Sequence, residues 1–239
     1  MSDGLFVAAS GAAARERQLD VLSSNLANAS TDGFQGERAS FESVLAVAGA
    51  RAIDKSYVAT RGTTTSFSPG PIRETGRDLD VAVEGDGFFV VSREGEADPL
   101  YTRLGRFEVD EGGRLVTPDG LVAEGTAGPI AGLNGVVRID RDGTVHNNGL
   151  RAGQLRMVRF DEPALLQKQG ALLYRPTQGA EPISVEPQVA QRSIEGSNVN
   201  AISVVGELVR VQRAFESATR AIDAYREMDR NLNAQVTGR

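Results

Sequence analysis

The last forty residues carry the pattern that most constrains the fold of this chain. From Val204 onward, apolar residues recur at alternating steps of four and three residues, and only Asp229 interrupts the series. A repeat of this period places one apolar stripe along a helix and favours a left-handed supercoil. A helix of about 35 residues is roughly 50 Å long and cannot bury such a stripe against itself, so it needs a partner helix. The stripe residues are Val204, Leu208, Val211, Phe215, Ala218, Ile222, Tyr225, Leu232 and Val236.

A second helical pattern occupies residues 5–29. Its apolar positions follow the same spacing, with Glu16 and Ser23 as exceptions, and the stripe is thin because it is rich in alanine. Alone, such a helix is marginal in water because helix nucleation is costly. It pairs either with the C-terminal helix of the same chain or with helices of neighbouring subunits. Its stripe residues are Leu5, Ala9, Ala12, Leu19 and Leu26.

Between residues 72 and 194 the pattern is that of short strands. Apolar and polar residues alternate over 80–84, and an apolar run follows at 88–91. Strands that are closely spaced and joined by Asp-Gly or Asn-Gly turns indicate an antiparallel sandwich or irregular barrel. No long helical pattern interrupts them, which argues against a parallel α/β sheet. The turn pairs are Asp86-Gly87, Asp119-Gly120, Asn134-Gly135, Asp142-Gly143 and Asn148-Gly149.

These patterns predict a mixed fold in four segments. The N-terminal helix of a helical layer takes residues 1–34, a linker or extended arm takes 35–71, a β-rich globular domain takes 72–196, and a long C-terminal helix takes 197–239. The central domain is antiparallel and all-β, and the two terminal helices are expected to pack as a coiled-coil-like layer. Asp229 either sets the register of that layer or lies beyond its packed part.

Composition excludes several classes of protein. The absence of cysteine rules out disulfides, thiolate metal sites and a cysteine nucleophile. A formal net charge of -6 without a dense basic run argues against a nucleic-acid-binding surface. No apolar run is long enough to span a bilayer. The N-terminus lacks the basic and apolar regions of a cleavable signal peptide.

The sequence offers no constellation of catalytic or metal-binding residues. His146 is the single histidine, no Gly-x-Ser-x-Gly elbow accompanies it, and we interpret it as a turn residue. Residues 140–144 are similar to the start of a calcium loop, but the remaining ligands and the closing glutamate are missing. A carbohydrate- or ligand-binding role for the β domain is a remote alternative, because aromatic residues are scarce at 5%. We therefore expect no enzyme activity, cofactor or metal.

Motifs at the start, middle and end of the chain occur together in one order. Asn-Leu-Ala-Asn at 25–28 precedes Thr-x-Gly-Phe at 31–34, and Gly-Asp-Gly-Phe-Phe stands at 85–89. Tyr-Thr-Arg-x-Gly-x-Phe follows at 101–107, then Leu-Val-Thr-x-x-Gly at 115–120, and Glu-Gly-Ser-Asn-Val-Asn at 195–200 immediately before the long helix. With this set the sequence resembles the bacterial flagellar rod and hook proteins over nearly its whole length.

The resemblance implies a structural role. Chain length and the Ala-Ser-Gly opening favour the proximal-rod class, the FlgF type, and a distal-rod or hook-like relative is the alternative. The family implies self-assembly through the terminal helices into an axial tube that transmits torque and conducts exported subunits. It also implies export by the flagellar type III apparatus without signal cleavage and residence in the periplasmic rod of the basal body. The implied partners are other rod subunits, further copies of the chain and the export apparatus, with no nucleic acid and no transmembrane segment.

The predicted assembly interface combines both stripes with the matched motifs. From residue type alone, Asn25 and Asn28 near a helix end are caps or surface residues. In the resembled family these positions are associated with packing between subunits, and we infer that both amides bond backbone groups of adjacent helices. The interface residues are Leu5, Ala9, Ala12, Leu19, Asn25, Leu26, Asn28, Thr31, Gly33, Phe34, Ser197, Asn198, Val199, Leu208, Val211, Phe215, Ile222, Tyr225 and Leu232.

Overall fold

The computed structural model describes residues 2–46, 55–96 and 98–237. The chain divides into two compact units. The helical unit comprises Met1–Ala27, Glu37–Ser66 and Asn200–Arg239, and the β unit comprises Asn28–Gly36 and Phe67–Val199. Each unit is therefore discontinuous in sequence, and the chain passes between them several times.

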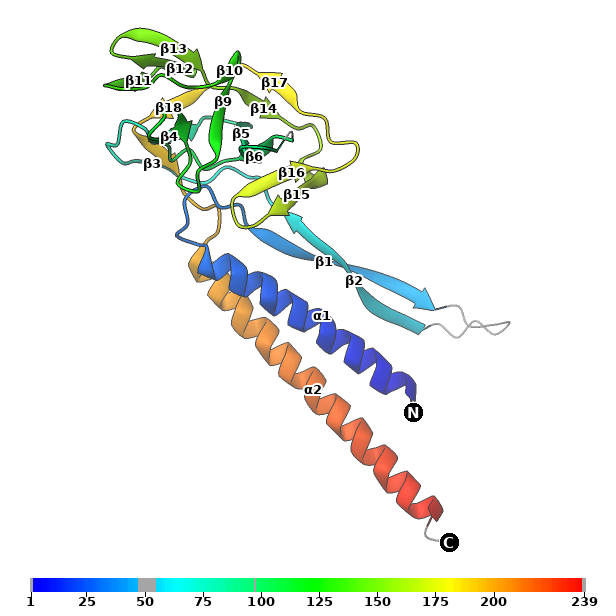
Figure 1. Cartoon of the computed structure of the whole chain (residues 1–239). Coiled ribbons are helices and arrows are strands. Elements are labelled where there is room, and N and C mark those ends of the chain that lie inside the picture. Colours follow the sequence, from blue (N-terminus) through cyan, green and yellow to red (C-terminus); the bar gives the residue numbers. More distant parts are fainter. Residues whose placement is uncertain (1, 47–54, 97, 238–239) are drawn as a thin grey trace. The chain divides into compact units, whose positions relative to one another are not determined.

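Two helices and a β-hairpin make up the helical unit. Helix α1 (Ser2–Ala27) runs antiparallel to helix α2 (Ala201–Thr237), and it also contacts strands β1 (Glu37–Ala46) and β2 (Lys55–Thr65) (Figure 1). Helix α1 thus lies between α2 and the hairpin. The α2 helix begins after Asn200, whose side-chain Oδ1 accepts a hydrogen bond from the Ser203 amide at 3.0 Å, the usual arrangement of an asparagine N-cap.

The partner of the C-terminal stripe is α1 of the same chain. From Val204 to Tyr225 the stripe positions are buried or half-buried, while most other positions of α2 are exposed. Near one end of the pair, Gln18 Nε2 donates to Glu207 Oε1 at 3.1 Å. Near the other end, the Tyr225 ring covers Gly4 so closely that a Cβ there would lie 2.7 Å from Tyr225 Cζ. Within the described part of the chain, the α2 stripe therefore packs against α1 of the same chain.

The segment expected as a linker or extended arm, 35–71, is largely strand. Strands β1 and β2 pair antiparallel from Glu37↔Thr65 to Ala46↔Lys55, with a register shift between Ser40 and Phe41. The run of threonines that we interpreted as part of a linker lies inside β2. Threonine is β-branched and favours strands, which agrees with the place of these residues in β2.

Short antiparallel strands build the β unit. The main sheet has the order β15-β16-β6-β5-β9-β8-β7, with β10 added to β9, β14 to β5 and β17 to β14. Its path ends at β15 and β7, so the sheet is open and forms no closed barrel. Further pairs are β18-β4 and β19-β3, and β11-β12-β13 form a separate small sheet (Figure 1). The prediction of antiparallel strands is confirmed, but the prediction of a barrel is wrong.

The strands of the β unit have the following bounds: β3 (Ile72–Glu74), β4 (Val81–Val83), β5 (Phe88–Ser92), β6 (Leu100–Thr102), β7 (Glu108–Val109), β8 (Leu115–Val116), β9 (Val122–Gly125), β10 (Gly128–Pro129), β11 (Val137–Ile139), β12 (Thr144–Asn147), β13 (Leu150–Gln154), β14 (Met157–Arg159), β15 (Leu166–Gln169), β16 (Leu173–Pro176), β17 (Ile183–Val185), β18 (Val189–Gln191) and β19 (Ser193–Glu195). A short 3₁₀ helix, η1 (Pro163–Leu165), precedes β15.

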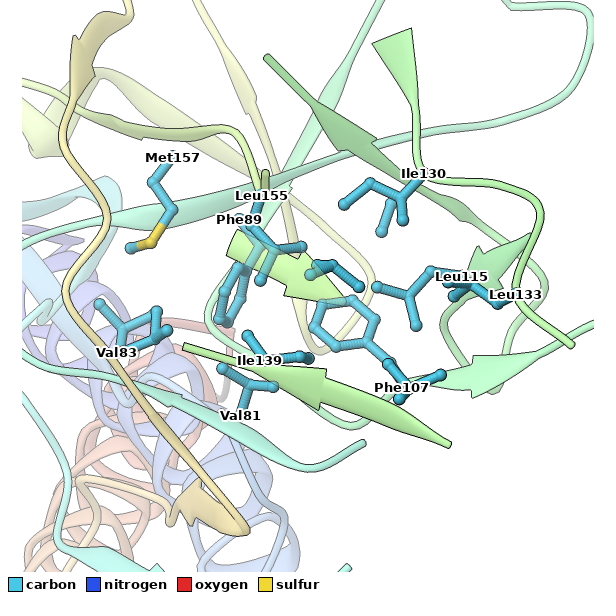
Figure 2. Packing of buried hydrophobic residues seen from close by; sticks show 14 residues of the cluster. Val81, Val83, Phe89, Phe107, Leu115, Ile130, Leu133, Ile139, Leu155 and Met157 are labelled. Carbon is cyan, nitrogen blue, oxygen red and sulfur yellow. The ribbon is translucent and has the colours of Figure 1, made fainter. Parts of the chain in front are cut away.

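Strand β5 lies at the centre of the core. Because successive side chains of a strand point to opposite faces, Phe89 enters one apolar cluster while Phe88 and Val90 enter another. The Phe89 ring meets Phe107 edge-on at a centroid distance of 5.3 Å, and aliphatic side chains fill the space around them (Figure 2). Burial on both faces explains why the sequence of this strand is a continuous apolar run.

Candidate functional site

The residues that follow α1 form a tight turn on the β unit. The Thr31 amide donates to the Asn28 carbonyl at 3.1 Å, and Gly33 has a φ of +71°. A Cβ at Gly33 would lie 2.7 Å from the backbone of Leu104. Positive φ and this close approach both require glycine at the position. Phe34 is buried beside it, and Lys168 Nζ lies 4.0 Å from the centre of its ring.

The segment that precedes α2 is bonded to this turn. The Gly33 amide donates to the Glu195 carbonyl at 2.8 Å, and the Asn198 amide donates to the Phe34 carbonyl at 3.3 Å. The Asn198 side chain adds further bonds: its Oδ1 accepts from the Gly36 amide at 2.8 Å, and its Nδ2 donates to Gln35 Oε1 at 2.7 Å and to the Ser68 carbonyl at 2.9 Å. The N-terminal and C-terminal motifs therefore meet within one unit, although more than 160 residues separate Gly36 from Asn198.

A single buried carboxylate joins these segments to the middle of the chain. Glu195 Oε2 accepts from Arg103 Nε at 2.8 Å. Its Oε1 accepts from Gln35 Nε2 at 3.2 Å and from the Gly70 amide at 2.9 Å. The Glu195 and Arg103 side chains are only 1% and 3% exposed. We call Gln35, Gly70, Arg103, Glu195 and Asn198 the junction.

The guanidinium of Arg103 extends the junction to the glycine-rich turn before β5. Its Nη1 donates to the carbonyls of Gly85 and Gly87 at 2.9 and 2.6 Å. Within the described part of the chain, Nη2 is buried without a hydrogen-bond partner. Arg103 thus connects two of the sequence motifs to the C-terminal one. Its charge is balanced by Glu195, which is the condition under which a buried ion is tolerated.

Asp32 adds a second pair of charge contacts at the rim of the turn. One carboxylate oxygen accepts from Arg106 at 2.7 Å and the other from Arg73 at 3.0 Å. Both arginines are partly exposed, so these pairs contribute less than the buried one. They hold the turn against β3 and the segment after β6.

The predicted interface residues fall into two groups. One group lies in the β unit at or near the junction: Asn28, Thr31, Gly33, Phe34, Ser197, Asn198 and Val199. The other lies in the helical unit, where Ala12, Asn25 and Val211 are buried, Ala9 is exposed, and Leu5, Leu19, Leu26, Leu208, Phe215, Ile222 and Tyr225 are half-buried. The side chains of Asp229 and Leu232 lie outside the described part.

Asn25 has a different partner from the one inferred from its position. Its Nδ2 donates to the Glu37 carbonyl at 2.7 Å, and its Oδ1 accepts from the Glu37 amide at 2.9 Å. The Asn25 side-chain amide therefore both donates to and accepts from the backbone of strand β1, as the backbone of a neighbouring strand would. Its partner is a strand of its own chain and not an adjacent helix.

Gln35, Arg103 and Glu195 were absent from the predicted interface. Arg103 and Glu195 stand inside the quoted motifs and Gln35 directly follows one, which is the only signal that pointed to them. That an arginine and a glutamate 92 residues apart are each other's buried partner follows from the fold alone.

The polar side chains around His146 bond to groups of the same chain. His146 lies in strand β12 rather than in a turn, and its Nε2 is 2.9 Å from Asp140 Oδ2. Arg138 binds the same carboxylate, and Arg138 with His146 holds the pKa of Asp140 below its ordinary value. Asp142 accepts bonds from Thr144. The carboxylates of Asp140 and Asp142 thus already accept hydrogen bonds from other groups of this chain. The described residues contain no group of three His, Asp or Glu that could hold a metal ion.

Comparison with known proteins identifies the family. Family profiles described as flagella basal body rod protein, flagellar hook protein FlgE/F/G D1 domain and flagellar basal body rod FlgEFG protein C-terminal match residues 5–35, 82–147 and 190–235. The flagellar basal-body rod protein FlgF of Caulobacter vibrioides is 34% identical over 97% of this chain and 96% of the relative. The chain belongs to the FlgF family of flagellar basal-body rod proteins.

Two further relatives are also flagellar basal-body rod proteins. FlgF of Mesorhizobium japonicum is 33% identical over 91% of the chain and 90% of its own length. A basal-body rod protein FlgG from Buchnera aphidicola is 29% identical over 98% of the chain. The FlgF family is structural, so the chain is a subunit of the flagellar rod and not an enzyme. None of the helices in the described part is long and apolar enough to cross a membrane.

Proposed function

We propose that this chain polymerises through its terminal helices into the axial tube of the proximal rod. The observation that carries the proposal is the match to FlgF relatives over almost the full length of both chains. In this arrangement the helices of many subunits form a coiled-coil-like inner layer and the β units form an outer layer. The tube transmits torque and conducts exported subunits, and its neighbours are other rod subunits and further copies of this chain.

Apolar side chains left exposed on the helical unit support the proposal. The heptad stripe of α2 packs against α1, so it is not the free surface of the pair. A second set of apolar residues on α2 remains accessible, with Ile202 86% exposed and Val205 and Val209 partly exposed. Phe6 and Val7 on α1 are exposed as well. Apolar groups clustered on a surface mark sites of association, and we propose that neighbouring helices cover them.

We further propose a route to the assembly site. The chain is exported by the flagellar type III apparatus without loss of a signal peptide and takes its place in the periplasmic span of the basal body. Purified hook–basal bodies provide the test. The chain is expected in them, and it is expected to be missing from the cell envelope of a strain that lacks the export apparatus. Its presence in the envelope but not in basal bodies contradicts the proposal.

A variant tests the helical surface itself. Ile202→Asp places a charge on a side chain that makes little contact within the subunit, so the helix content measured by circular dichroism should not change. We expect the variant to be lost from basal bodies. Gln212→Asp, at another exposed position of the same helix, is the matched control and should assemble. Normal incorporation of Ile202→Asp refutes this role of the surface.

A further inference from the structure

The two helices that pair are far apart in the sequence. Helix α1 ends at Ala27 and α2 begins at Ala201, so about 170 residues form the loop that must close before the helices meet. Pairing across such a loop is entropically costly. Anything that brings the end of α1 close to the start of α2 along the chain lowers that cost.

The junction brings the end of α1 close to the start of α2 along the chain. Through the bonds between Gly33 and Glu195 and between Phe34 and Asn198, the end of α1 connects to the start of α2 by a path of about ten residues. Loop-closure entropy scales with the logarithm of loop length with a coefficient of 3/2, so shortening the path from about 170 to about 10 residues raises the effective concentration of one helix at the other about 70-fold.

We propose that Glu195 is a positioning residue that couples closure of the β unit to pairing of α1 with α2. Its carboxylate holds together the turn after α1, through Gln35, and the middle of the chain, through Arg103. Its own backbone leads directly into α2. When this carboxylate is satisfied, the end of α1 and the start of α2 are held close together. When it is not, the backbone bonds of Gly33 and Asn198 hold them alone and open more often, and the helices are then joined only by the long loop.

A disulfide between the helices measures their pairing. The natural chain has no cysteine, so the double variant Gln18→Cys/Glu207→Cys introduces the only two thiols, at side chains that are in hydrogen-bond contact. With excess oxidised glutathione as the two-electron oxidant, the rate at which the intramolecular disulfide forms in the full-length monomer reports how often α1 and α2 meet. Adding Glu195→Gln removes the charge. Because only one of the two terminal atoms of glutamine accepts hydrogen bonds, either Arg103 or the pair of Gly70 and Gln35 loses its acceptor. We expect the rate to fall at least tenfold.

Two further variants separate positioning from a general loss of stability. Leu115→Ala removes a fully buried side chain from the core of the β unit without touching the junction, and it should leave the rate unchanged below its melting temperature. Asn198→Ala removes the bonds to Gln35 and the Gly36 amide while keeping the ion pair, and should lower the rate by a smaller factor. Circular dichroism establishes that the β unit of each variant is folded.

An insertion provides the decisive readout. Ten flexible residues placed between Val199 and Asn200 double the short path, so the rate should fall about threefold when Glu195 is present. In the Glu195→Gln background the path is about 170 residues long whenever the backbone bonds of Gly33 and Asn198 are open. An insertion hardly changes a path of that length, so its effect should be smaller than in the chain with Glu195. Equal effects in both backgrounds, or an unchanged rate in Glu195→Gln, overturn the inference. Because the assay uses monomers, its outcome does not depend on whether the rod assembly proposed above takes place.

Discussion

Glu195 and Arg103 form a buried ion pair at 2.8 Å, and within the described residues Arg103 Nη2 is the one nitrogen or oxygen of these two side chains that has no hydrogen-bond partner. The glutamate belongs to the motif before α2 and the arginine to the motif after β6. Gln35, which follows the motif after α1, donates to the same carboxylate. Motifs spread over the whole length of the chain therefore meet at one charge pair.

Removing one partner of this pair should strongly destabilise the β unit. Arg103→Met leaves the Glu195 carboxylate buried without its cation, and the expected cost is about 3–5 kcal/mol. Urea unfolding followed by circular dichroism gives the difference. Glu84→Gln, which breaks the exposed pair with Arg141, is the control and should cost less than about 1 kcal/mol. Similar values for both variants would show that burial does not govern the Arg103 pair.

Gly33→Ala should destabilise the turn after α1 more than an ordinary positive-φ glycine would. The new methyl group adds backbone strain and a clash with Leu104, together about 2–4 kcal/mol. Gly120 has a similar φ of +77° but no atom within 4 Å of a Cβ, so Gly120→Ala should cost only about 1–2 kcal/mol. Thermal unfolding of the two variants compares strain with and without the clash. A lower melting temperature for Gly120→Ala contradicts the expectation.

Asn25→Ala should loosen the hairpin from α1. The substitution removes both hydrogen bonds to the Glu37 backbone and leaves that amide and carbonyl without their partner, at an expected cost of about 1–3 kcal/mol. Hydrogen exchange at the Glu37 amide is the measurement, because this amide donates to Asn25 Oδ1. Ser23→Ala, at an exposed position of the same helix, serves as the control. Unchanged protection of Glu37 would mean that the hairpin is held by other contacts.

The carboxylate of Asp140 should titrate below the ordinary range of aspartate. The hydrogen bond from Arg138 is the main cause that lowers the pKa of Asp140, and His146 lowers this pKa further. A depressed pKa in the folded state contributes stability that is present above the unfolded-state value of about 3.9 and is lost as the pH falls through the folded-state pKa. Carboxyl chemical shifts followed by NMR should show the pKa of Asp140 rising in Arg138→Gln.

Asp110 is the internal reference for that titration. Its pKa is lowered by hydrogen bonds from Arg114, which are independent of Arg138, so it should titrate identically in both proteins. A shift of Asp110 together with Asp140 would show that the substitution acts through a wider change of structure.

Much of the architecture was predictable because its signals are local. The spacing of Val204, Leu208 and Val211 is enough to predict one face of a long helix, and the turn pairs are enough to predict short antiparallel strands. An extended arm was expected at 35–71, but its pairing into a hairpin was not predicted, because the second strand runs through Gly62 and a row of threonines. A sequence of this kind is also typical of a surface loop. Contact of the segment with α1 decides whether it forms a strand or a loop.

Within the site, the sequence placed Gly33, Phe34 and Asn198 correctly in motifs of one family, but not the contacts among them. What the sequence by itself determined is the family, the two helical stripes and the antiparallel β region, since each rests on residue type and short-range spacing. Only the tertiary structure decided that the α2 stripe packs on α1 of the same chain and that Glu195 receives Arg103. Both depend on which of many distant, chemically suitable partners the folded backbone brings within bonding distance, and no local pattern contains that choice.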